Sequence, residues 1–326
     1  MYDVRRTGAV IAALVTLFVG GVAEALPASA EQTASCSTTQ TARPLGTAIK
    51  GAIEISGDVD AYRVSVPSNQ WVGISLINLP ADFGFDVRTT SGDLLTSVSS
   101  ATGVGFERVF RRFSAGTYCI RVFGIGTAHS SAQYALVPSA LGNSMRLLNA
   151  VVTQEDGNFR VTGEVFNGTS APRDNVRLNV SLKTSTGSVL SYDTVNAYSS
   201  STMVRPGTAI AFSDFVYSNG AASVGFPNGP IADLSYCTLG DQGVRLEGVS
   251  HVRAYGIHTA SAVAVNSSAS RSMRMSLNQY DLAGKVVGVE WTSYDYVASL
   301  STTSFVATTT ADTRARRWLT PIYQEC

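Results

Sequence analysis

Alternation of apolar and polar residues is the feature of this chain that most constrains its fold. It is clearest from Val161 to Phe215, where apolar side chains recur at every second position in several runs. A period of two is the period of a half-buried β-strand. The segments Asn167-Gly-Thr-Ser-Ala-Pro and Thr184-Ser-Thr-Gly187 separate these runs and have the composition of turns. The stretch therefore predicts four or more short antiparallel strands, and it shows no helical period.

A fainter copy of this stretch follows about a hundred residues later, from Ser261 to Phe305. Each copy has an apolar run that ends in an asparagine, Asn167 in the first and Asn266 in the second. The spacing from this asparagine to a turn glycine is 20 residues in the first copy and 18 in the second. Removing two residues leaves the facing of a strand unchanged, because side chains alternate with a period of two. We therefore expect two successive β-sandwich domains of one kind.

The first copy resembles the FxLYD family of bacterial Ig-like β-sandwich domains. The residues that carry the resemblance are Gly163-Glu-Val-Phe-Asn167, Ser181-Leu182, the turn Gly187, and Pro206-Gly207 before Phe212. The Leu-Tyr-Asp of the family motif is absent from the first copy, and Gln279-Tyr-Asp281 in the second copy comes nearer to it. The resemblance implies an Ig-like fold and an extracellular setting, and it supplies no catalytic residues.

Length and charge narrow the classes of protein to which the chain can belong. Its 326 residues suffice for two or three domains. Charged residues make up 15% of the chain and the formal net charge is zero, so the composition lacks the basic excess of a nucleic-acid-binding protein. Val, Thr, Ser and Gly abound, whereas strong helix formers are sparse. We therefore expect an all-β protein with no nucleic-acid partner.

The first 30 residues have the three parts of a secretory signal peptide. Arg5 and Arg6 supply the positive charge, residues 9–22 are apolar, and Ala28-Ser-Ala30 is a cleavage site of the A-x-A type. The apolar segment is short for a membrane span. The residues that follow Arg5-Arg6 and those that precede Cys36 depart from the twin-arginine and lipoprotein patterns. We expect cleavage after Ala30, a protein that is secreted or held at the cell surface, and no membrane span after cleavage.

The mature chain keeps four cysteines, Cys36, Cys119, Cys237 and Cys326. An even number in an exported protein indicates disulfides, and the chain has no C-x-x-C pair of the kind that binds zinc. Of the three connectivities, Cys36–Cys119 with Cys237–Cys326 fits the domain boundaries given below. Cys119 has the strand parity opposite to Tyr118, so it points away from the core and can tether the N-terminal segment. Each bridge closes a loop of roughly 80 to 90 residues and contributes on the order of 4 kcal/mol.

Residues 31–140 also alternate, and turn sequences separate their apolar runs. Four motifs follow in order: Gly57-Asp-Val-Asp-Ala-Tyr62, Phe85-Asp-Val-Arg-Thr-Thr-Ser-Gly92, Ala115-Gly-Thr-Tyr-Cys-Ile-Arg-Val122 and Tyr134-Ala-Leu-Val137. Together they resemble the bacterial pre-peptidase C-terminal domain family (PPC), with Ala61 where the family commonly has Trp. The resemblance implies a jelly-roll-like β-sandwich that accompanies secreted hydrolases, with folding, secretion or matrix-binding roles rather than catalysis.

Four aspartates of this domain, Asp58, Asp60, Asp82 and Asp86, are the best candidates for a metal site. Calcium takes six to eight oxygen ligands, several of them carboxylates, and some members of the PPC family bind it. Aspartates near turns also accept hydrogen bonds from backbone N–H groups without any metal. We favour this capping role and expect no cofactor, with Ca²⁺ at Asp58, Asp60 and Asp86 as the alternative.

Patterns that indicate catalysis are scarce in the sequence. The three histidines are His129, His251 and His258. Seven residues separate the last two, which places them on opposite faces of a single strand and disfavours a metal pair. The chain contains no G-x-S-x-G, H-E-x-x-H, P-loop or dinucleotide-binding pattern. A Ser/His/Asp triad assembled from distant loops stays open as an alternative.

A cluster of aromatic residues near the C-terminus is the candidate ligand-binding site: Trp291, Tyr294 and Tyr296. Glu290 and Asp295 accompany it, and two carboxylates among aromatic side chains also occur in glycosidase clefts. A strand with a core Trp and a polar edge is commoner in β-sandwiches. Tyr294 and Tyr296 share one strand face, on which they present a flat surface to a sugar or a protein.

The sequence therefore predicts an all-β protein of tandem β-sandwich domains. The expected divisions are a signal peptide (1–30), a jelly-roll or PPC-like sandwich (31–140), an Ig-like FxLYD-type sandwich (141–240) and a divergent repeat of the latter (241–326). We expect a secreted or cell-surface protein that is not an enzyme and that binds an extracellular polysaccharide or protein. The alternatives are an accessory or inhibitor subunit of a separately encoded secreted hydrolase, and a hydrolase itself.

Overall fold

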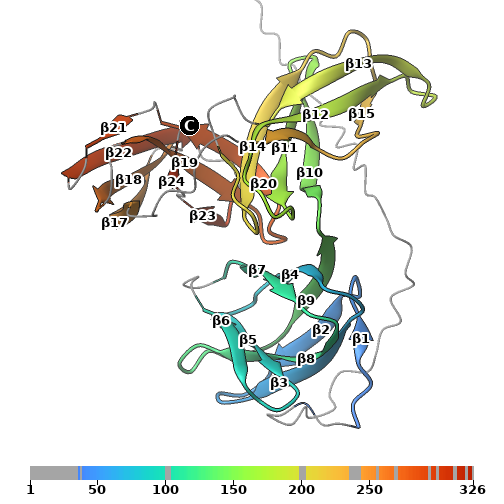
Figure 1. The fold of residues 1–326 in the computed structure, drawn as a ribbon, viewed down its shortest axis with the longest axis vertical. Helices are drawn as coiled ribbons and strands as arrows, with labels where there is room; N and C mark the ends of the chain where they lie inside the picture. The colour runs from blue at the N-terminus through green and yellow to red at the C-terminus, as the bar shows by residue number, and fades with distance from the viewer. Residues whose placement is uncertain are drawn as a thin grey trace, which may run out of the picture.

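A computed structural model describes residues 36, 39–99, 104–197, 203–234, 244–254, 257–267, 271–292, 295–298, 301–310, 314–319 and 322–324. Within these ranges every regular element is a β-strand, which confirms the predicted all-β class, and none is a helix that could cross a membrane. The strands form six sheets, two in each of three modules (Figure 1). We call them the first (36–142), second (145–234) and third (244–324) modules.

The first module is a sandwich of a five-stranded sheet, in the order β1-β3-β8-β5-β6, on a four-stranded sheet, β2-β9-β4-β7. Its strands are β1 (Arg43–Pro44), β2 (Ile49–Ile53), β3 (Val59–Val66), β4 (Gln70–Ile77), β5 (Phe83–Thr89), β6 (Leu94–Val98), β7 (Glu107–Phe113), β8 (Gly116–Gly124) and β9 (Ser130–Gly142). Inward-facing side chains of both sheets form one hydrophobic core between them, because alternate residues of each strand turn to the same side.

The second module pairs a three-stranded sheet, β10-β11-β14, with a sheet built around β12, to which β13, β15 and β16 are hydrogen-bonded. Its strands are β10 (Met145–Glu155), β11 (Asn158–Asn167), β12 (Arg173–Lys183), β13 (Val189–Asn196), β14 (Ala209–Val216), β15 (Ser223–Gly225) and β16 (Ile231–Leu234). Only two residues separate β9 of the first module from β10, so the chain passes almost directly from one sandwich into the next.

The third module pairs the sheet β17-β18-β22 with a sheet built around β19, to which β20, β21, β23 and β24 are hydrogen-bonded. Its strands are β17 (Val244–Ala254), β18 (Ile257–Asn266), β19 (Arg271–Tyr280), β20 (Val286–Trp291), β21 (Asp295–Val297), β22 (Ser301–Thr310), β23 (Arg317–Leu319) and β24 (Ile322–Gln324). Its core contains small residues and methionines where the second module has valines and leucines.

Strand pairing in the second and third modules corresponds element by element. The first hairpin of each has a register shift at the same place, between Leu148 and Val151 on β10 and between Glu247 and Ser250 on β17. Each module also has a register shift just before the turn of its β12–β13 or β19–β20 hairpin. A β-bulge at a matching position bends both sheets in the same way.

Two buried asparagines hold equivalent loops in these modules. Asn167 donates from Nδ2 to the carbonyls of Ala171 and Val204, at 2.9 and 2.8 Å. Asn266 donates from Nδ2 to the carbonyls of Val297 and Ala298, at 3.1 and 3.0 Å. Both side chains lie at the end of the central strand of their sheet, and both are almost fully buried. Each therefore donates two hydrogen bonds to backbone carbonyls from a buried position.

We expect Asn167→Ala and Asn266→Ala each to lower the free energy of unfolding by about 2–3 kcal/mol, because each change removes two hydrogen bonds made by a buried amide. Asn179→Ala is the matched control, because this partly exposed side chain lies on the outer surface of β12, and it should change stability by no more than about 0.5 kcal/mol. Urea unfolding followed by fluorescence measures all three variants. Equal stability of Asn167→Ala and Asn179→Ala would contradict the role given to Asn167.

Candidate functional site

A buried ion pair lies where the three modules meet. Arg108 of β7 donates from Nη1 to Glu164 Oε2 on β11, and both side chains are less than a tenth exposed. The Tyr280 hydroxyl of β19 donates to Glu164 Oε1 at 3.1 Å. Arg108 also donates from Nη2 to the Gly284 carbonyl at 2.9 Å and from Nε to Ser75 Oγ at 3.2 Å. One ion pair therefore connects all three modules through side chains and backbone.

Aromatic rings enclose this pair on the side of the first module. The Arg108 guanidinium carbon lies 4.8 Å from the ring centroid of Phe106 and 5.8 Å from that of Phe110. The Phe110 ring packs on Phe166 of β11 with centroids 5.0 Å apart, and Phe106 packs on Tyr280 at 5.1 Å. The rings exclude water from the ion pair, which strengthens the attraction between its charges.

The hairpin of β19 and β20 lies on the outer surface of β11 and β14. Thr162 Oγ1 of β11 donates to the Val286 carbonyl of β20 at 2.7 Å, and the Val286 side chain packs with Ala211 of β14 in a buried cluster. The turn of this hairpin also reaches the first module, because the Asn78 N–H donates to the Leu282 carbonyl at 3.1 Å. The neighbouring Gly284 has φ +71°, and an added Cβ would lie 2.8 Å from Arg108 Nη2, so the turn requires glycine.

Strand β11 is consequently buried on both surfaces. Phe159, Val161 and Val165 face the core of the second module. Thr162, Glu164 and Phe166 have the opposite parity and contact the other two modules. No spacing pattern in the sequence predicts that Arg108, Glu164 and Tyr280 meet. The available signal was a carboxylate inside the apolar run Gly163-Glu-Val-Phe-Asn167.

The structure places two of the candidate metal-binding aspartates, Asp60 and Asp86, apart from each other. Asp60 is paired in register with Val122, and Asp86 with the adjacent Arg121, so the two carboxylates lie on opposite surfaces of their sheet. In the part of the chain that the structure describes, no three His, Cys, Asp or Glu side chains form a group that could hold a metal ion. The N–H of Asp58 closes the turn at residues 55–58 by donating to the Ile55 carbonyl at 3.2 Å.

Asp60 is buried in the first module and accepts hydrogen bonds from two tyrosines. The Tyr134 hydroxyl donates to Asp60 Oδ2, and the Tyr62 hydroxyl does so at 3.2 Å. Burial raises the pKa of the Asp60 carboxyl above its ordinary value, and the hydrogen bonds from the tyrosines oppose that rise. A Cβ added at Gly51 would lie within 2.6 Å of all three polar groups, so this glycine makes room for them. The arrangement is a satisfied polar network inside the sandwich.

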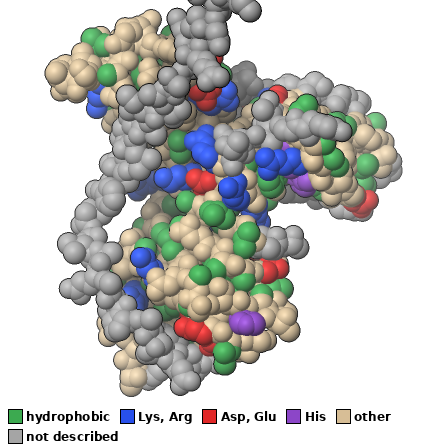
Figure 2. All heavy atoms as spheres, turned by 180° about the vertical axis from the view of Figure 1, so that it is seen from behind, with side chains coloured by type: hydrophobic (Ala, Val, Ile, Leu, Met, Phe, Trp, Pro, Cys, Tyr) green, Lys and Arg blue, Asp and Glu red, His purple; other side chains and the backbone are tan. Residues whose placement is uncertain are grey.

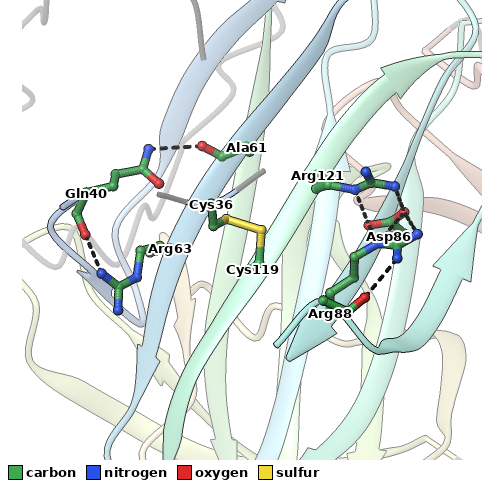
Figure 3. The surroundings of a disulfide bond; sticks show 9 residues. Cys36, Gln40, Ala61, Arg63, Asp86, Arg88, Cys119 and Arg121 are labelled. Atoms are coloured by element: carbon green, nitrogen blue, oxygen red, sulfur yellow. Dashed lines mark hydrogen bonds and ion pairs between the residues drawn. A yellow bond between two sulfur atoms is a disulfide. The ribbon is translucent and has the colours of Figure 1, made fainter. Parts of the chain in front are cut away.

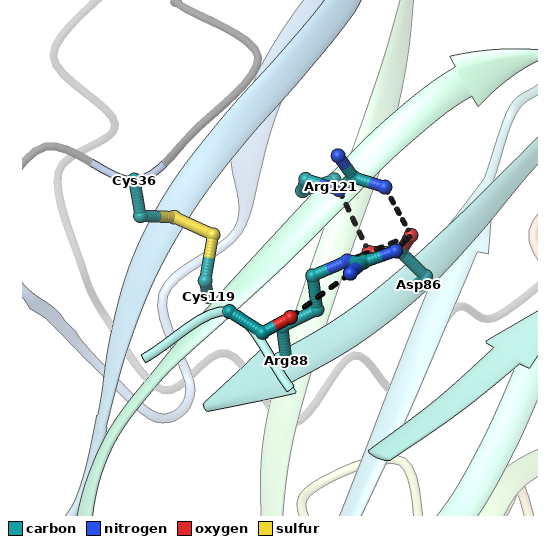
Figure 4. Close-up of polar contacts among 6 residues, drawn as sticks. Cys36, Asp86, Arg88, Cys119 and Arg121 are labelled. Carbon is teal, nitrogen blue, oxygen red and sulfur yellow. Dashed lines mark hydrogen bonds and ion pairs between the residues drawn. A yellow bond between two sulfur atoms is a disulfide. The ribbon is translucent and has the colours of Figure 1, made fainter. Parts of the chain in front are cut away.

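Asp86 lies on the outer surface of the same sheet between two arginines (Figures 3 and 4). Arg121 Nη2 lies 2.6 Å from Asp86 Oδ2 and Arg88 Nη2 lies 3.2 Å from it. Burial alone acts to raise the pKa of the Asp86 carboxyl, but the hydrogen bonds from Arg121 and Arg88 outweigh it and hold the pKa below its ordinary value. The carboxylate is therefore already neutralised by side chains of its own sheet.

The predicted disulfide between Cys36 and Cys119 is confirmed, with Cα atoms 5.7 Å apart (Figure 3). Cys119 pairs in register with Arg63 on β3 and Arg88 on β5, on the outer surface of the sheet as expected. Gln40 adds to this attachment, because its Nε2 donates to the Ala61 carbonyl at 3.0 Å and its own carbonyl accepts from Arg63 at 2.9 Å. Cys237 and Cys326 lie outside the described residues.

The predicted aromatic site is only partly described. Trp291 ends β20, is half-buried, and packs against the core cluster of the second module. The Arg274 guanidinium carbon lies 4.0 Å from the centroid of the Trp291 ring system. Glu290 is exposed on the same strand. Tyr294 and the side chains of Asp295 and Tyr296 lie outside the described residues.

The expectation that His251 and His258 lie on opposite faces is wrong. They belong to two antiparallel strands, β17 and β18, and not to one strand. His251 pairs in register with Ala260, which shares its face with His258. The two rings are therefore in contact, with His251 Nδ1 3.0 Å from His258 Nε2, and His258 stacks on Trp318 at 4.6 Å between centroids. Burial, with the nearby His251 and Arg253, lowers the pKa of His258 to about 4.

An exposed group of one arginine and two aromatic residues stands on the outer surface of the second module, at the end of β11 and β14. Phe215 and Arg160 pair in register, and the Arg160 guanidinium carbon lies 4.6 Å from the Phe215 ring centroid. Glu155 Oε2 accepts from Arg160 Nε at 2.9 Å and fixes the guanidinium over the ring. Phe215 is 49% exposed and Tyr217, two residues later, is 70% exposed. We call Arg160, Phe215 and Tyr217 the arginine–aromatic surface.

The sequence contains a signal for this surface in the parity of β14. Phe212 and Val216 have core parity on β14, whereas Phe215 has solvent parity. An aromatic side chain on the solvent face of a strand, where the core does not require it, indicates a binding surface more strongly than an aromatic side chain in the core does. Figure 2 shows hydrophobic and basic side chains intermixed on the rear surface of the molecule.

Comparisons with known proteins identify similar sandwiches and no family. No protein-family model matches the chain, and no curated protein sequence is significantly similar to it. The pre-peptidase C-terminal domain of a collagenase from Bacillus anthracis is 19% identical, with a TM-score of 0.27, and the match covers 32% of this chain and 100% of that one.

Two larger structures also match. A β-glucuronidase from Bacteroides uniformis is 10% identical over 73% of this chain, with a TM-score of 0.30, and the match spans 26% of the glucuronidase. A DUF4785 family protein from Legionella pneumophila is 12% identical over 87% of this chain and 89% of its own length, with a TM-score of 0.18. At such identities and TM-scores these likenesses carry no argument about function, and the FxLYD resemblance stays a prediction.

Removal of the Arg108 charge from the buried ion pair with Glu164 should strongly destabilise the protein. We expect Arg108→Met to lower the free energy of unfolding by about 3–5 kcal/mol, because it leaves the Glu164 carboxylate buried without its partner. The double variant Arg108→Met with Glu164→Met should recover part of that loss. Arg160→Met on β11 is the matched control, since its ion pair with Glu155 is about one-third exposed and is worth less than about 1 kcal/mol. Additive losses in the double variant would contradict this coupling.

Stability should fall as the pH drops from about 6.5 towards 4. His258 has a pKa below its ordinary value in the folded state, so the unfolded chain takes up the proton first and is favoured below the ordinary pKa. His258→Phe, which keeps a ring against Trp318, should reduce this loss, whereas His129→Phe at an exposed position should not. Urea unfolding at a series of pH values measures the effect. An unchanged pH profile in His258→Phe would exclude this residue as the cause.

Proposed function

We propose that this protein is an exported, non-catalytic binding protein whose third module is a divergent copy of the second, FxLYD-like one. The arginine–aromatic surface of Arg160, Phe215 and Tyr217 is the observation that carries the proposal. Arginine and aromatic side chains contribute disproportionately to binding energy at protein interfaces. Aromatic rings also give sugars a flat apolar contact.

The position of this surface supports a binding role because Arg160 is held over the Phe215 ring before a ligand arrives. Glu155 orients Arg160, and Arg160 in turn covers part of the Phe215 ring. Both β11 and β14 are regular strands in the sheet on which the third module packs, so Arg160 and Phe215 stand on rigid elements, and Tyr217 directly follows the end of β14. A preorganised surface loses less conformational entropy on binding.

An extracellular polysaccharide or protein is the ligand class that we propose. The disulfide at Cys36–Cys119 agrees with an oxidising compartment, and the sequence begins with the parts of a signal peptide. The surface offers apolar rings and a single guanidinium that already has a carboxylate partner. Hydroxyl-rich chains and neutral protein surfaces suit such a site better than polyanions do.

We expect the mature protein, residues 31–326, to be retained on at least one insoluble material from a panel of peptidoglycan, chitin, cellulose and collagen. Phe215→Ala with Tyr217→Ala should reduce retention at least tenfold, a loss of about 1.4 kcal/mol. Leu94→Ala, at an exposed position of the first module, is the control and should bind as the unchanged protein does.

Soluble products should be assayed in the same tubes. Retention without released sugar or peptide is the expected result. Released product would overturn the non-catalytic assignment and direct attention to Glu290 and Asp295. Retention that depends on a co-purified secreted hydrolase would instead identify an accessory subunit. Equal binding of the double variant and Leu94→Ala would remove the arginine–aromatic surface from the proposal.

A further inference from the structure

The contact between the second and third modules has two complementary parts. The first is the β19–β20 hairpin, whose Val286 and Val287 are 0% and 5% exposed. The second is the outer surface of β10-β11-β14, where Thr162 donates to the Val286 carbonyl and Ala211 packs against the Val286 side chain. A hairpin from one Ig-like module thus occupies the outer sheet surface of another.

The hairpin of the second module that corresponds to β19–β20 has no such neighbour among the described residues. Its turn has the same hydrogen bonds, since Thr184 N–H donates to the Ser188 carbonyl as Asp281 N–H donates to the Lys285 carbonyl. After the register shift, Val189 pairs with Lys183 just as Val286 pairs with Tyr280. Val189, Leu190 and Tyr192 therefore occupy the positions of Val286, Val287 and Val289.

These three side chains are 45%, 51% and 70% exposed. Their strand, β13, has the sequence Val-Leu-Ser-Tyr-Asp-Thr-Val-Asn and forms the edge of its sheet. It contains no lysine or proline, which are the residues that commonly protect an edge strand from association. The positions that are buried by contact in the third module thus form an apolar exposed strip in the second.

The outer sheet surface of the third module is also uncovered by the described residues. The register pairs Ser261 with Val306 where the second module pairs Thr162 with Ser213. It pairs Val263 with Ser304 where the second module pairs Glu164 with Ala211. Val306 is 60% exposed and Val252, on the neighbouring β17, is 59% exposed. These positions of β18, β22 and β17 carry hydroxyl and aliphatic groups, and Glu247 of β17 lies beside Val263 on the same surface.

We propose that the β12–β13 hairpin of one molecule docks on the outer surface of β17-β18-β22 of a second copy of this chain. The contact would repeat between molecules the arrangement that joins the second and third modules within one. The surface formed by Ser261, Val263 and Val306 offers hydroxyl and aliphatic groups to Val189, Leu190 and Tyr192. The charges beside these residues are opposite in sign, because Glu247 pairs in register with Val263 and Lys183 of the hairpin pairs in register with Val189. Ser261 supplies a hydroxyl where Thr162 donates to the docked strand.

The two surfaces differ from each other, so the contact is heterologous and leaves one free surface at each end of a dimer. In Figure 1 the strands β13 and β18 lie on opposite sides of the molecule, which allows copies to add head to tail. The contact between molecules lacks the Arg108 and Phe106 groups by which the first module holds the β19–β20 turn. We therefore expect weak association, with a dissociation constant on the order of 100 μM.

Light scattering on the mature chain, at concentrations from about 1 μM to 1 mM, tests the proposal. The average mass should rise with concentration and pass beyond that of a dimer. Tyr192→Asp disables the hairpin and Val306→Arg disables the sheet surface, so each variant alone should stay monomeric. Leu94→Asp in the first module is the control and should associate as the unchanged protein does. Melting curves establish that every variant is folded.

A mixture of the two disabled variants gives the decisive result. Val306→Arg retains an intact hairpin and Tyr192→Asp retains an intact sheet surface, so an equimolar mixture should form a dimer of one of each and nothing larger. A mass that does not change with concentration in the unchanged protein overturns the proposal. Association of the unchanged protein without dimer formation in the mixture also overturns it, because the interface would then be symmetric or lie elsewhere.

Discussion

The ion pair of Arg108 and Glu164 is the interaction on which the arrangement of the three modules depends. Two charges withdrawn from water are costly unless every donor and acceptor around them is used. Here the Tyr280 hydroxyl, the Gly284 carbonyl and Ser75 Oγ complete the set. Together with Arg108 and Glu164 themselves, these groups come from all three modules. A shift of any one module would leave a buried charge without one of its hydrogen-bond partners. The arrangement of the three modules is consequently specified by hydrogen bonds and an ion pair as well as by apolar contacts.

The strand β11 shows how one sheet can belong to two interfaces. Its odd-numbered positions build the sandwich of the second module, and its even-numbered positions receive the first and third modules. The equivalent strand β18 has Val263 and Val265 where β11 has Glu164 and Phe166. The same framework therefore carries a covered surface in one module and, in the other, an uncovered surface whose central strand has no charged side chain at these positions. That asymmetry leads to the head-to-tail association proposed above.

Binding residues on such a framework gain from its rigidity. Arg160 and Phe215 lie on the same outer surface as Thr162 and Glu164 but beyond the docked hairpin. Their backbone is fixed by a sheet that two neighbouring modules also constrain, so ligand binding need not order them. The network of Asp60, Tyr62 and Tyr134 serves the first module in a comparable way, because it satisfies a buried carboxylate with side chains of the same sandwich.

The sequence by itself determined the properties that depend on neighbours in the chain. Alternation predicted four or more antiparallel strands from Val161 to Phe215, where β11, β12, β13 and β14 are observed. Parity placed Cys119 on the outer surface, where it meets Cys36. Only the tertiary structure decided which strands become neighbours. Parity within one assumed strand separated His251 from His258, whereas a hairpin brings them into contact. The meeting of Arg108, Glu164 and Tyr280 depends on the docking of three modules, and no local pattern encodes contacts between residues so far apart in the chain.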